Sequence, residues 1–511
     1  MNYDMAKQRS GLIRETLVVA VLLLAMLLLG FWTVGGTVLV TRPLWLDEYH
    51  TLLVANAGLL EGIRALAAGA DVHPPLLYIL LSPLRLGSDI DAVKLRLFSL
   101  AAVIVGLLFL YLTLRRFAKP VAAFAGIVAV WAHPLLLRHS FEGRHYGPFF
   151  LMAAFLAFSV GLDRSSNQSF KRDAAIAVSS VLLCTIHYFG VLAWFLIFSA
   201  SFVTWSVGRS SPVRRSIAFL AGPVALGTCL PFYVGQREVF GYMTWVPRAT
   251  VEGAERFVAD LYLWLPLVVC LLAWFVLTVY QGRNSSSTTT NYCNRADTNS
   301  LLALSLLPAL VIAVSFLVQP SMVPRYAVAT LLFYAPVFAI VLTHVFPWAR
   351  IAALAILVGW FLTKSIDDAD REAKRHAEDV SVNRRMVDSV GAGQLVIAPF
   401  QHSLYPLMDE DNNVRLAFPV FSRDEIERVY PPGAAGEAKG RLMQMMQMSS
   451  QVHASRFGFP TVLSAENIRR ETVFWLLLSN NQKQVREYTA AFLPTHSVEQ
   501  RGARLYRLEL R

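Results

Sequence analysis

Two adjacent carboxylates and a histidine lie within one polar loop that follows an apolar segment. Asp47 and Glu48 stand in the stretch LWLDEY, and the same loop ends at Asp71-Val72-His73-Pro74-Pro75. Because consecutive residues of a helix do not face each other, the two carboxylates do not suit the opposed acid and base of a glycosidase. They suit one catalytic base with a second carboxylate that orients it. For the dipeptide alone, however, a solvated turn is the stronger interpretation. His73 suits a hydrogen-bond donor, a ligand or, most simply, a helix-entry residue before two prolines.

Basic and aromatic residues gather in further short motifs. The stretch SFEGRHY contains Glu142, Arg144 and Tyr146, and the planar guanidinium of an arginine suits phosphate oxygens. A belt of residues at the membrane interface would also place arginine and tyrosine at these positions. For this motif the sequence favours neither phosphate binding nor an interface belt. The other motifs, for which ordinary interface chemistry is favoured when each is taken alone, are His187-Tyr188, Pro324-Arg325-Tyr326 and Tyr242–Arg248 (YMTWVPR).

The composition predicts an all-α polytopic membrane protein. Of the 511 residues, 55% are hydrophobic and only 16% are charged, whereas soluble domains carry about a quarter charged residues. The apolar residues form long runs, and about eleven of these runs approach the roughly twenty residues that a helix needs to cross the hydrocarbon. The predicted spans are 16–36, 93–114, 121–138, 147–162, 174–187, 189–206, 216–234, 257–280, 301–318, 326–345 and 350–363.

The distribution of lysine and arginine predicts the topology. The run 16–36 lacks a convincing cleavage site and is interpreted as an anchor, and Lys7, Arg9 and Arg14 before it place the N-terminus in the cytoplasm. The stretch 74–86 is short and begins with prolines, so we expect a juxtamembrane or re-entrant helix in the first outer loop. The later basic clusters then also fall inside, and all the motifs above fall outside. The net charge of +11 is therefore topological rather than a sign of nucleic-acid binding, with a second role in holding phosphate left open.

The long apolar runs end near residue 364, and the different composition of the following tail predicts a second domain. Residues 1–364 form the expected transmembrane domain, and residues 365–511 form a small soluble α/β domain outside the membrane. Short apolar runs at Gln394–Phe400, Val473–Leu478 and Arg504–Leu510 are typical of strands. None of the four cysteines forms a CxxC pair, so the sequence supports neither a metal site nor a disulfide framework.

The motifs together resemble one family. The stretches LWLDEYHTLL, DVHPPLLYILL, SFEGRHY, TIHYFG and PRYAVATLLFYAP occur in its expected order. Over about residues 10–350 the chain resembles the membrane-embedded C-type glycosyltransferases, specifically the bacterial relatives of dolichyl-phosphate-mannose protein mannosyltransferases and lipid A aminoarabinose transferases. The resemblance implies a bacterial inner-membrane enzyme, a hexosyl- or pentosyltransferase, that uses a polyprenyl-phosphate sugar and inverts the anomeric centre. The acceptor, whether lipid, polysaccharide or protein, stays open.

The resemblance also implies roles for individual residues. Asp47 would be the catalytic base, and Glu48 would support it or shape the acceptor site. Arg144 and Tyr146 match an Arg-x-Tyr motif near the lipid phosphate, Arg325 matches a late-loop basic position, and His145 departs from the small or apolar residue usual there. No cofactor is required, although the carboxylate and histidine of the first loop would suit a divalent metal. The remaining expected substrate-binding residues are His73, Glu142, His187, Tyr188 and Tyr326.

Two alternatives belong to other functional classes. A transporter or flippase for a lipid-linked substrate usually carries ionisable residues near the bilayer midplane and related halves, whereas the acidic residues here collect at outer ends and no matching halves are evident. A membrane scaffold with a partner-binding tail would not explain the carboxylate, histidine and arginine motifs together.

Overall fold

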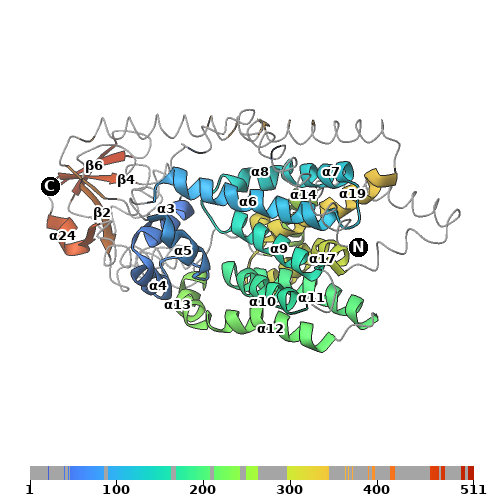
Figure 1. Cartoon of the computed structure of the whole chain (residues 1–511). Helices are drawn as coiled ribbons and strands as arrows, with labels where there is room; N and C mark the ends of the chain where they lie inside the picture. The colour runs from blue at the N-terminus through green and yellow to red at the C-terminus, as the bar shows by residue number, and fades with distance from the viewer. Residues whose placement is uncertain are drawn as a thin grey trace. The chain divides into compact units, whose positions relative to one another are not determined.

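The computed structural model describes residues 46–85, 90–162, 169–207, 212–241, 249–262 and 296–344, several single positions, and most of the sheet of the tail. The chain forms two compact units (Figure 1). We call Met1–Val40, Val93–Cys229 and Val246–Arg371 the bundle unit, and Thr41–Ala92, Leu230–Trp245 and Glu372–Arg511 the sheet unit. The predicted domain boundary near residue 364 stays a prediction; the sheet unit takes in residues 41–92 and 230–245 as well as the tail.

The described part of the bundle unit consists mostly of apolar helices. Several begin with proline in their first turn, where its missing N–H costs nothing. The described elements are α6 (Ala92–Leu114), α7 (Pro120–Trp131), α8 (Pro134–Ser140), α9 (Tyr146–Val160), α10 (Ser169–Ile186), α11 (Gly190–Val207), α12 (Pro212–Gly227), α14 (Val251–Tyr262), α17 (Ala296–Ala303), η3 (Leu304–Leu306), α18 (Leu307–Leu317), η4 (Pro324–Phe333) and α19 (Tyr334–His344).

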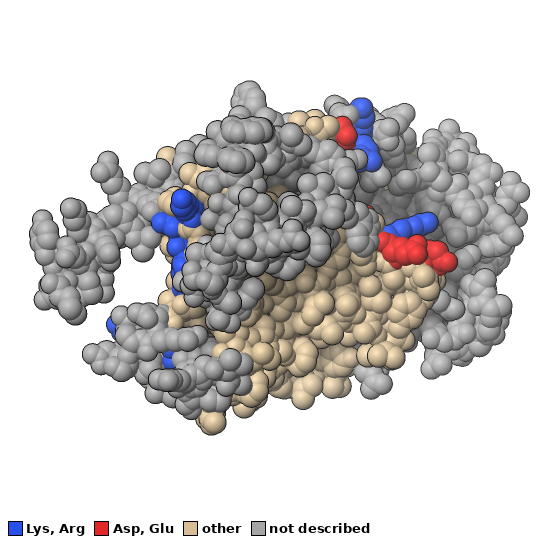
Figure 2. Space-filling view, turned by 90° about the vertical axis from the view of Figure 1, so that its right-hand side faces the viewer, with Lys and Arg blue, Asp and Glu red and all other residues tan. Residues whose placement is uncertain are grey.

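These helices make the chain a multi-pass membrane protein. Four described helices are long and apolar enough to cross a membrane: Ala92–Leu114, Ser216–Gln236, Ala296–Leu317 and Pro324–Leu342. Shorter apolar helices overlap other predicted spans, and the spans 16–36 and 350–363 lie outside the described part of the chain apart from single positions. In Figure 2 the middle of the described surface carries no Lys, Arg, Asp or Glu, and the few charged side chains lie at its edges.

One predicted span differs from the structure. The span 121–138 is a pair of helices, α7 and α8, bent by 72°. Pro134 causes the break, because the residue before a proline avoids the helical region and His133 is extended, with φ −63° and ψ 125°. Of the predicted span 257–280, residues 263–280 lie outside the described residues. Its start lies inside α14, which is amphipathic: Phe257 and Leu261 are buried and the acidic residues of the helix are exposed.

Helix packing in the bundle unit relies on small residues. Helix α10 packs against α9 and α12, and α7 packs against α19 (Figure 1). At the α7–α19 contact, a Cβ atom added to Gly126 would lie 2.6 Å from the carbonyl oxygen of Ala335 and 3.1 Å from Leu114. Apolar lipid offers little drive for helices to associate, so close backbone approach of this kind is what membrane helices use to pack.

Substitution of Gly126 by alanine is expected to lower the stability of the purified protein by about 1–3 kcal/mol, the usual cost of overpacking. A backbone carbonyl cannot rotate away from the new methyl group, so α7 and α19 have to separate. Gly227 is the matched control, because nothing lies within 4 Å of an added Cβ there. Thermal unfolding in detergent checks both variants: a melting temperature of Gly126→Ala equal to that of Gly227→Ala would contradict this account of the contact.

The sheet unit begins with the segment that the sequence predicts to be the first outer loop. Its helices α3 (Leu46–Asn56), α4 (Leu59–Ala67) and α5 (Leu76–Leu81) are followed by η1 (Ser82–Arg85). Helix α5 has six residues, far fewer than a crossing needs, which agrees with the short juxtamembrane helices predicted there. A fifth element, α13 (Leu230–Gly241), packs against α4.

The tail forms a six-stranded mixed sheet, in agreement with the predicted α/β tail (Figure 1). The strand order is β3-β2-β1-β4-β6-β5. The pairs β1–β2, β1–β4 and β2–β3 are parallel, and β6 pairs antiparallel with both β4 and β5. The three predicted strands are β1, β4 and β6. The elements are β1 (Leu395–Ile397), β2 (Arg415–Val420), β3 (Thr461–Ser464), α24 (Ala465–Arg470), β4 (Val473–Leu477), β5 (His496–Gln500) and β6 (Leu505–Leu510).

Candidate active site

The two adjacent carboxylates occupy the first turn of α3 but differ in burial. Asp47 is half-buried, whereas Glu48 is fully buried. Acidic side chains are favoured at this end of a helix, where the backbone N–H groups carry partial positive charge. The hydroxyl of Thr51 donates to the carbonyl oxygen of Asp47 at 3.2 Å. Asp47 is therefore the carboxylate that is open to a reactant, while Glu48 belongs to the interior.

His73 lies in a turn that other buried polar side chains hold. Its own side chain is buried, and two residues earlier the carboxylate of Asp71 accepts a hydrogen bond from the backbone N–H of Val72 at 2.7 Å. The second oxygen of Asp71 accepts a hydrogen bond from the hydroxyl of Tyr78 on α5. Asp71 therefore connects the turn before the double proline to the helix after it.

Contacts from α3 and α13 hold the same turn. The Nδ1 atom of His50, three residues after Asp47, lies 2.9 Å from the carbonyl oxygen of Ala70. The amide of Gln236 on α13 is fully buried and donates to the carbonyl oxygen of His73 at 3.1 Å. The helix that carries Asp47 and the turn that carries His73 are thus joined through His50. Gln236 reaches the same turn from a residue 163 positions later in the chain.

Three predicted residues, Tyr146, His187 and Tyr326, form a cluster with Phe149 and Phe189 in the bundle unit, which we call the aromatic cluster. The ring of His187 is central. It stacks on Phe149 with centroids 5.3 Å apart and planes 9° apart, and it lies 5.4 Å from the ring of Tyr326. The guanidinium carbon of Arg325 lies 5.6 Å from the centre of the Tyr146 ring, within the range of a cation–π contact. Sequence positions far apart therefore meet in one place.

The stretch SFEGRHY reaches this cluster through a tight turn after α8. The carboxylate of Glu142 is hydrogen-bonded to Nδ1 of His139, and the backbone N–H of Arg144 donates to the carbonyl oxygen of Glu142 at 2.7 Å. The ring of His139 lies 5.1 Å from that of Tyr146. Gly147 permits the close approach to α6, because an added Cβ would lie 2.6 Å from the carbonyl oxygen of Ser99.

The charges around the aromatic cluster favour an anion. Arg144 is buried, Arg325 is half-buried, and these two guanidinium groups and the carboxylate of Glu142 act on the hydroxyl of Tyr146. The ring of His187 is buried, and Arg144 and Arg325 both act on it electrostatically. Two guanidinium groups and one carboxylate are thus among the described charges that act on these rings, and a guanidinium group suits the oxygens of an anion such as phosphate.

The other predicted residues complete the comparison with the structure. Tyr188 is half-buried beside His187, and His145, the departure from the family pattern, is buried with its ring 6.3 Å from that of His187. The stretch Tyr242–Arg248 lies outside the described residues. The structure thus brings Glu142, Arg144, Tyr146, His187, Arg325 and Tyr326 together in the bundle unit, and Asp47, Glu48 and His73 belong to the sheet unit.

Sequence reasoning missed several residues that hold these two groups. Asp71 lies in a motif that the sequence analysis names, two positions before His73. Tyr78, Gln236 and His139 could not be predicted from the local sequence, because only the fold shows which residues they contact. Within the described part of the chain, no three His, Cys, Asp or Glu side chains gather closely enough to hold a metal ion.

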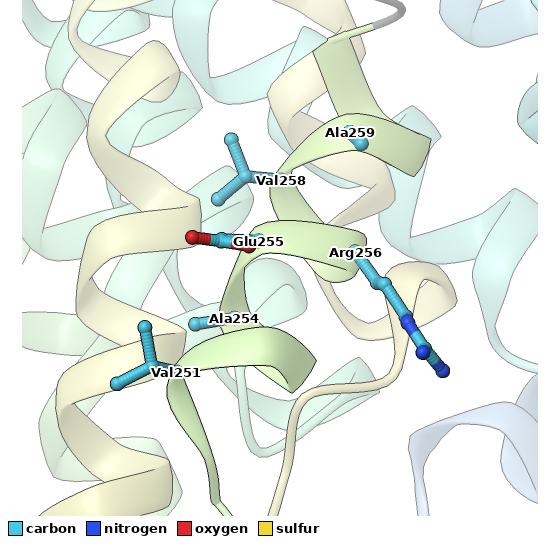
Figure 3. A pocket seen from close by; sticks show the side chains of 6 residues that line it. All are labelled: Val251, Ala254, Glu255, Arg256, Val258 and Ala259. Atoms are coloured by element: carbon cyan, nitrogen blue, oxygen red, sulfur yellow. The ribbon is translucent and has the colours of Figure 1, made fainter.

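A cavity of about 630 Å³ lies along α14, and none of the predicted site residues lines it. Its lining is Val251, Ala254, Glu255, Arg256, Val258 and Ala259, and Figure 3 shows Glu255 on the same side of the helix as Val251 and Val258, with Arg256 pointing to the opposite side. A carboxylate among apolar side chains does not suit an anion. The aromatic cluster is therefore the better candidate for a site that binds an anion.

No protein-family model and no curated protein sequence matches the chain, whereas solved structures do. The crystal structure of ArnT from Cupriavidus metallidurans bound to undecaprenyl phosphate is similar with a TM-score of 0.57 and 12% sequence identity, and the similarity covers 98% of each chain. ArnT in the apo state has a TM-score of 0.59 and 12% identity, over 96% of this chain and 97% of that one. The chain therefore shares the C-type glycosyltransferase fold of ArnT, which confirms the fold class predicted from the sequence motifs.

Proposed function

We propose that the protein is an inverting glycosyltransferase that moves a sugar from a polyprenyl-phosphate carrier to an acceptor of the cell envelope. One observation carries this proposal: Arg144 and Arg325, from distant parts of the sequence, act on the same buried Tyr146. They do so within a fold shared with a protein whose crystal structure holds undecaprenyl phosphate. Two guanidinium groups beside aromatic rings, in a chain that crosses the membrane several times, suit a phosphate on an apolar tail.

The reaction follows from the two groups of residues. Asp47 removes the proton from an acceptor hydroxyl, and the oxygen attacks the anomeric carbon from the face opposite the phosphate. The bond between that carbon and the phosphate oxygen breaks, and its electron pair stays on the phosphate. Arg144 and Arg325 stabilise the negative charge that develops there, which requires no metal. Attack from the opposite face inverts the configuration of the sugar.

The remaining residues support this reaction. Glu48, buried next to Asp47 in the chain, holds the base in place rather than contacting the acceptor directly, and the His73 turn positions the donor. Tyr146, Tyr326 and Tyr188 contact the sugar or the phosphate. We place the enzyme in the bacterial inner membrane with its N-terminus in the cytoplasm. In this orientation Asp47, Arg144 and Arg325 are all expected on the outer side of the membrane.

Mass spectrometry of envelope glycans and lipids tests the proposal and names the substrates. A strain that lacks the gene is expected to lose one hexose or pentose from one envelope component, and the wild-type gene is expected to restore it. Purified protein in detergent should also transfer the sugar, which a flippase would not do because a micelle has no two sides. An unchanged envelope together with no transfer in detergent would refute the proposed function.

A further inference from the structure

The turn between α10 and α11 uses one nitrogen of His187 for the backbone. The N–H of Phe189 donates to Nδ1 of His187 at 3.1 Å, and the N–H of Gly190 donates to the carbonyl oxygen of His187 at 2.8 Å. The side chain thereby satisfies one of the backbone donors at the start of α11, as a capping residue does. A neutral imidazole that accepts at Nδ1 carries its proton at Nε2.

The rest of the ring is directed by its neighbours. Nε2 lies at the far end of the ring from the backbone, so it points away from the turn. The ring packs between Phe149 and Tyr326, and the rings of Tyr146 and His145 each have centroids 6.3 Å from that of His187. Arg144 and Arg325 both act electrostatically on this ring. The N–H of His187 is thus a neutral donor in the place where the two guanidinium groups favour an anion.

We propose that His187 has two separate roles: Nδ1 caps α11, and the Nε2–H donates a hydrogen bond to a phosphate oxygen of the lipid carrier. The inference rests on the proposed function, because the anion is taken to be the carrier's phosphate. Arg144 and Arg325 supply the positive charge that binds the phosphate. His187 supplies a neutral hydrogen-bond donor that orients the phosphate, and it does not transfer a proton to the leaving group. His187 is accordingly a binding residue and not a general acid.

Two substitutions separate the two roles. Asparagine places its amide near the position of Nδ1, so His187→Asn keeps the cap and loses the distant donor. Glutamine places its amide near the position of Nε2, so His187→Gln keeps the donor and loses the cap. Binding of undecaprenyl phosphate to the full-length protein in detergent is expected to weaken by about 10- to 100-fold in His187→Asn, the usual cost of a hydrogen bond to a charged group. His187→Gln should bind within about threefold of wild type but melt at a lower temperature.

The controls make each outcome decisive. Undecaprenol, which lacks the phosphate, serves as the comparison ligand for every variant. Wild-type protein that does not prefer undecaprenyl phosphate to undecaprenol would refute the proposed function itself. Wild-type protein that has this preference, together with His187→Asn that binds undecaprenyl phosphate equally well, would refute only the role of His187. Binding lost in His187→Gln and kept in His187→Asn would assign the residue to capping alone.

The pH dependence gives a second readout, which separates a neutral hydrogen-bond donor from a protonated imidazole. A histidine that served as a charged ligand would titrate near its ordinary pKa of about 6.5. With the ring neutral throughout, the ratio of wild-type to His187→Gln affinities is expected to stay constant from about pH 6 to pH 8. A ratio that rises as the pH falls through this range would show a protonated imidazole and overturn the inference.

Discussion

Replacing Asp47 with asparagine is expected to slow sugar transfer by about 10²- to 10⁴-fold, the usual contribution of a general base. Asparagine has nearly the shape of aspartate but cannot take a proton from the acceptor hydroxyl. Asp47 is half-buried at the start of α3, so the change should leave the fold intact. Turnover is measured with purified protein in detergent, and binding of undecaprenyl phosphate is measured in parallel, because the base does not hold the carrier and affinity should be unchanged.

Asp91 provides the matched control for this substitution. It is an exposed carboxylate near the end of the same loop, immediately before α6. Asp91→Asn removes the same charge and should leave turnover within about twofold of wild type, as surface changes usually do. Equal turnover in Asp47→Asn and wild type would refute the assignment of the base. A loss of turnover equal in the two variants would point to the charge of the loop as a whole.

The elements of the fold that are strongly apolar could be predicted from the sequence. Helix α6 spans Ala92–Leu114 against a predicted 93–114, because a run of this length has one stable form in a membrane. The strands β1, β4 and β6 carry clear apolar runs, whereas β5, HSVEQ, is a polar strand at the edge of the sheet. The missed β2 contains Pro419, and proline counts against a strand. Strands β2 and β5 form because they pair with neighbouring strands, and the local sequence does not reveal this pairing.

The site could be predicted only in part, for a similar reason. Charge patterns predict that the motifs lie on one side of the membrane. In the structure, contacts and charges link six of the predicted residues within the bundle unit. The bonds that hold them in place join residues far apart in the sequence. Gln236 binds the His73 turn from 163 positions away, which no local pattern indicates. The two arginines that act on the ring of His187 lie 43 and 138 positions away, and only the fold brings them near.

The second large effect is expected at Arg144 and Arg325, where substitution by lysine keeps the charge but removes the planar fork. If the arginines stabilise charge as it develops on the leaving phosphate, each lysine variant should lower kcat by about 10²- to 10³-fold, as loss of one such donor does elsewhere. Arg138→Lys is the matched control, because Arg138 belongs to the last turn of α8 but is exposed. Single-turnover measurements with saturating donor separate the chemical step from binding.

The double variant decides whether the two arginines act on one phosphate. Groups that bind the same anion are coupled, so the combined effect of Arg144→Lys and Arg325→Lys should differ from the product of the single effects. Independent effects that multiply would place the two side chains on different parts of the substrate. Lysine variants that keep the wild-type kcat and raise only KM would mean that the arginines bind donor and transition state equally. The carrier would then be recognised at this cluster without being activated there, and the charge on the leaving group would need another source of stabilisation.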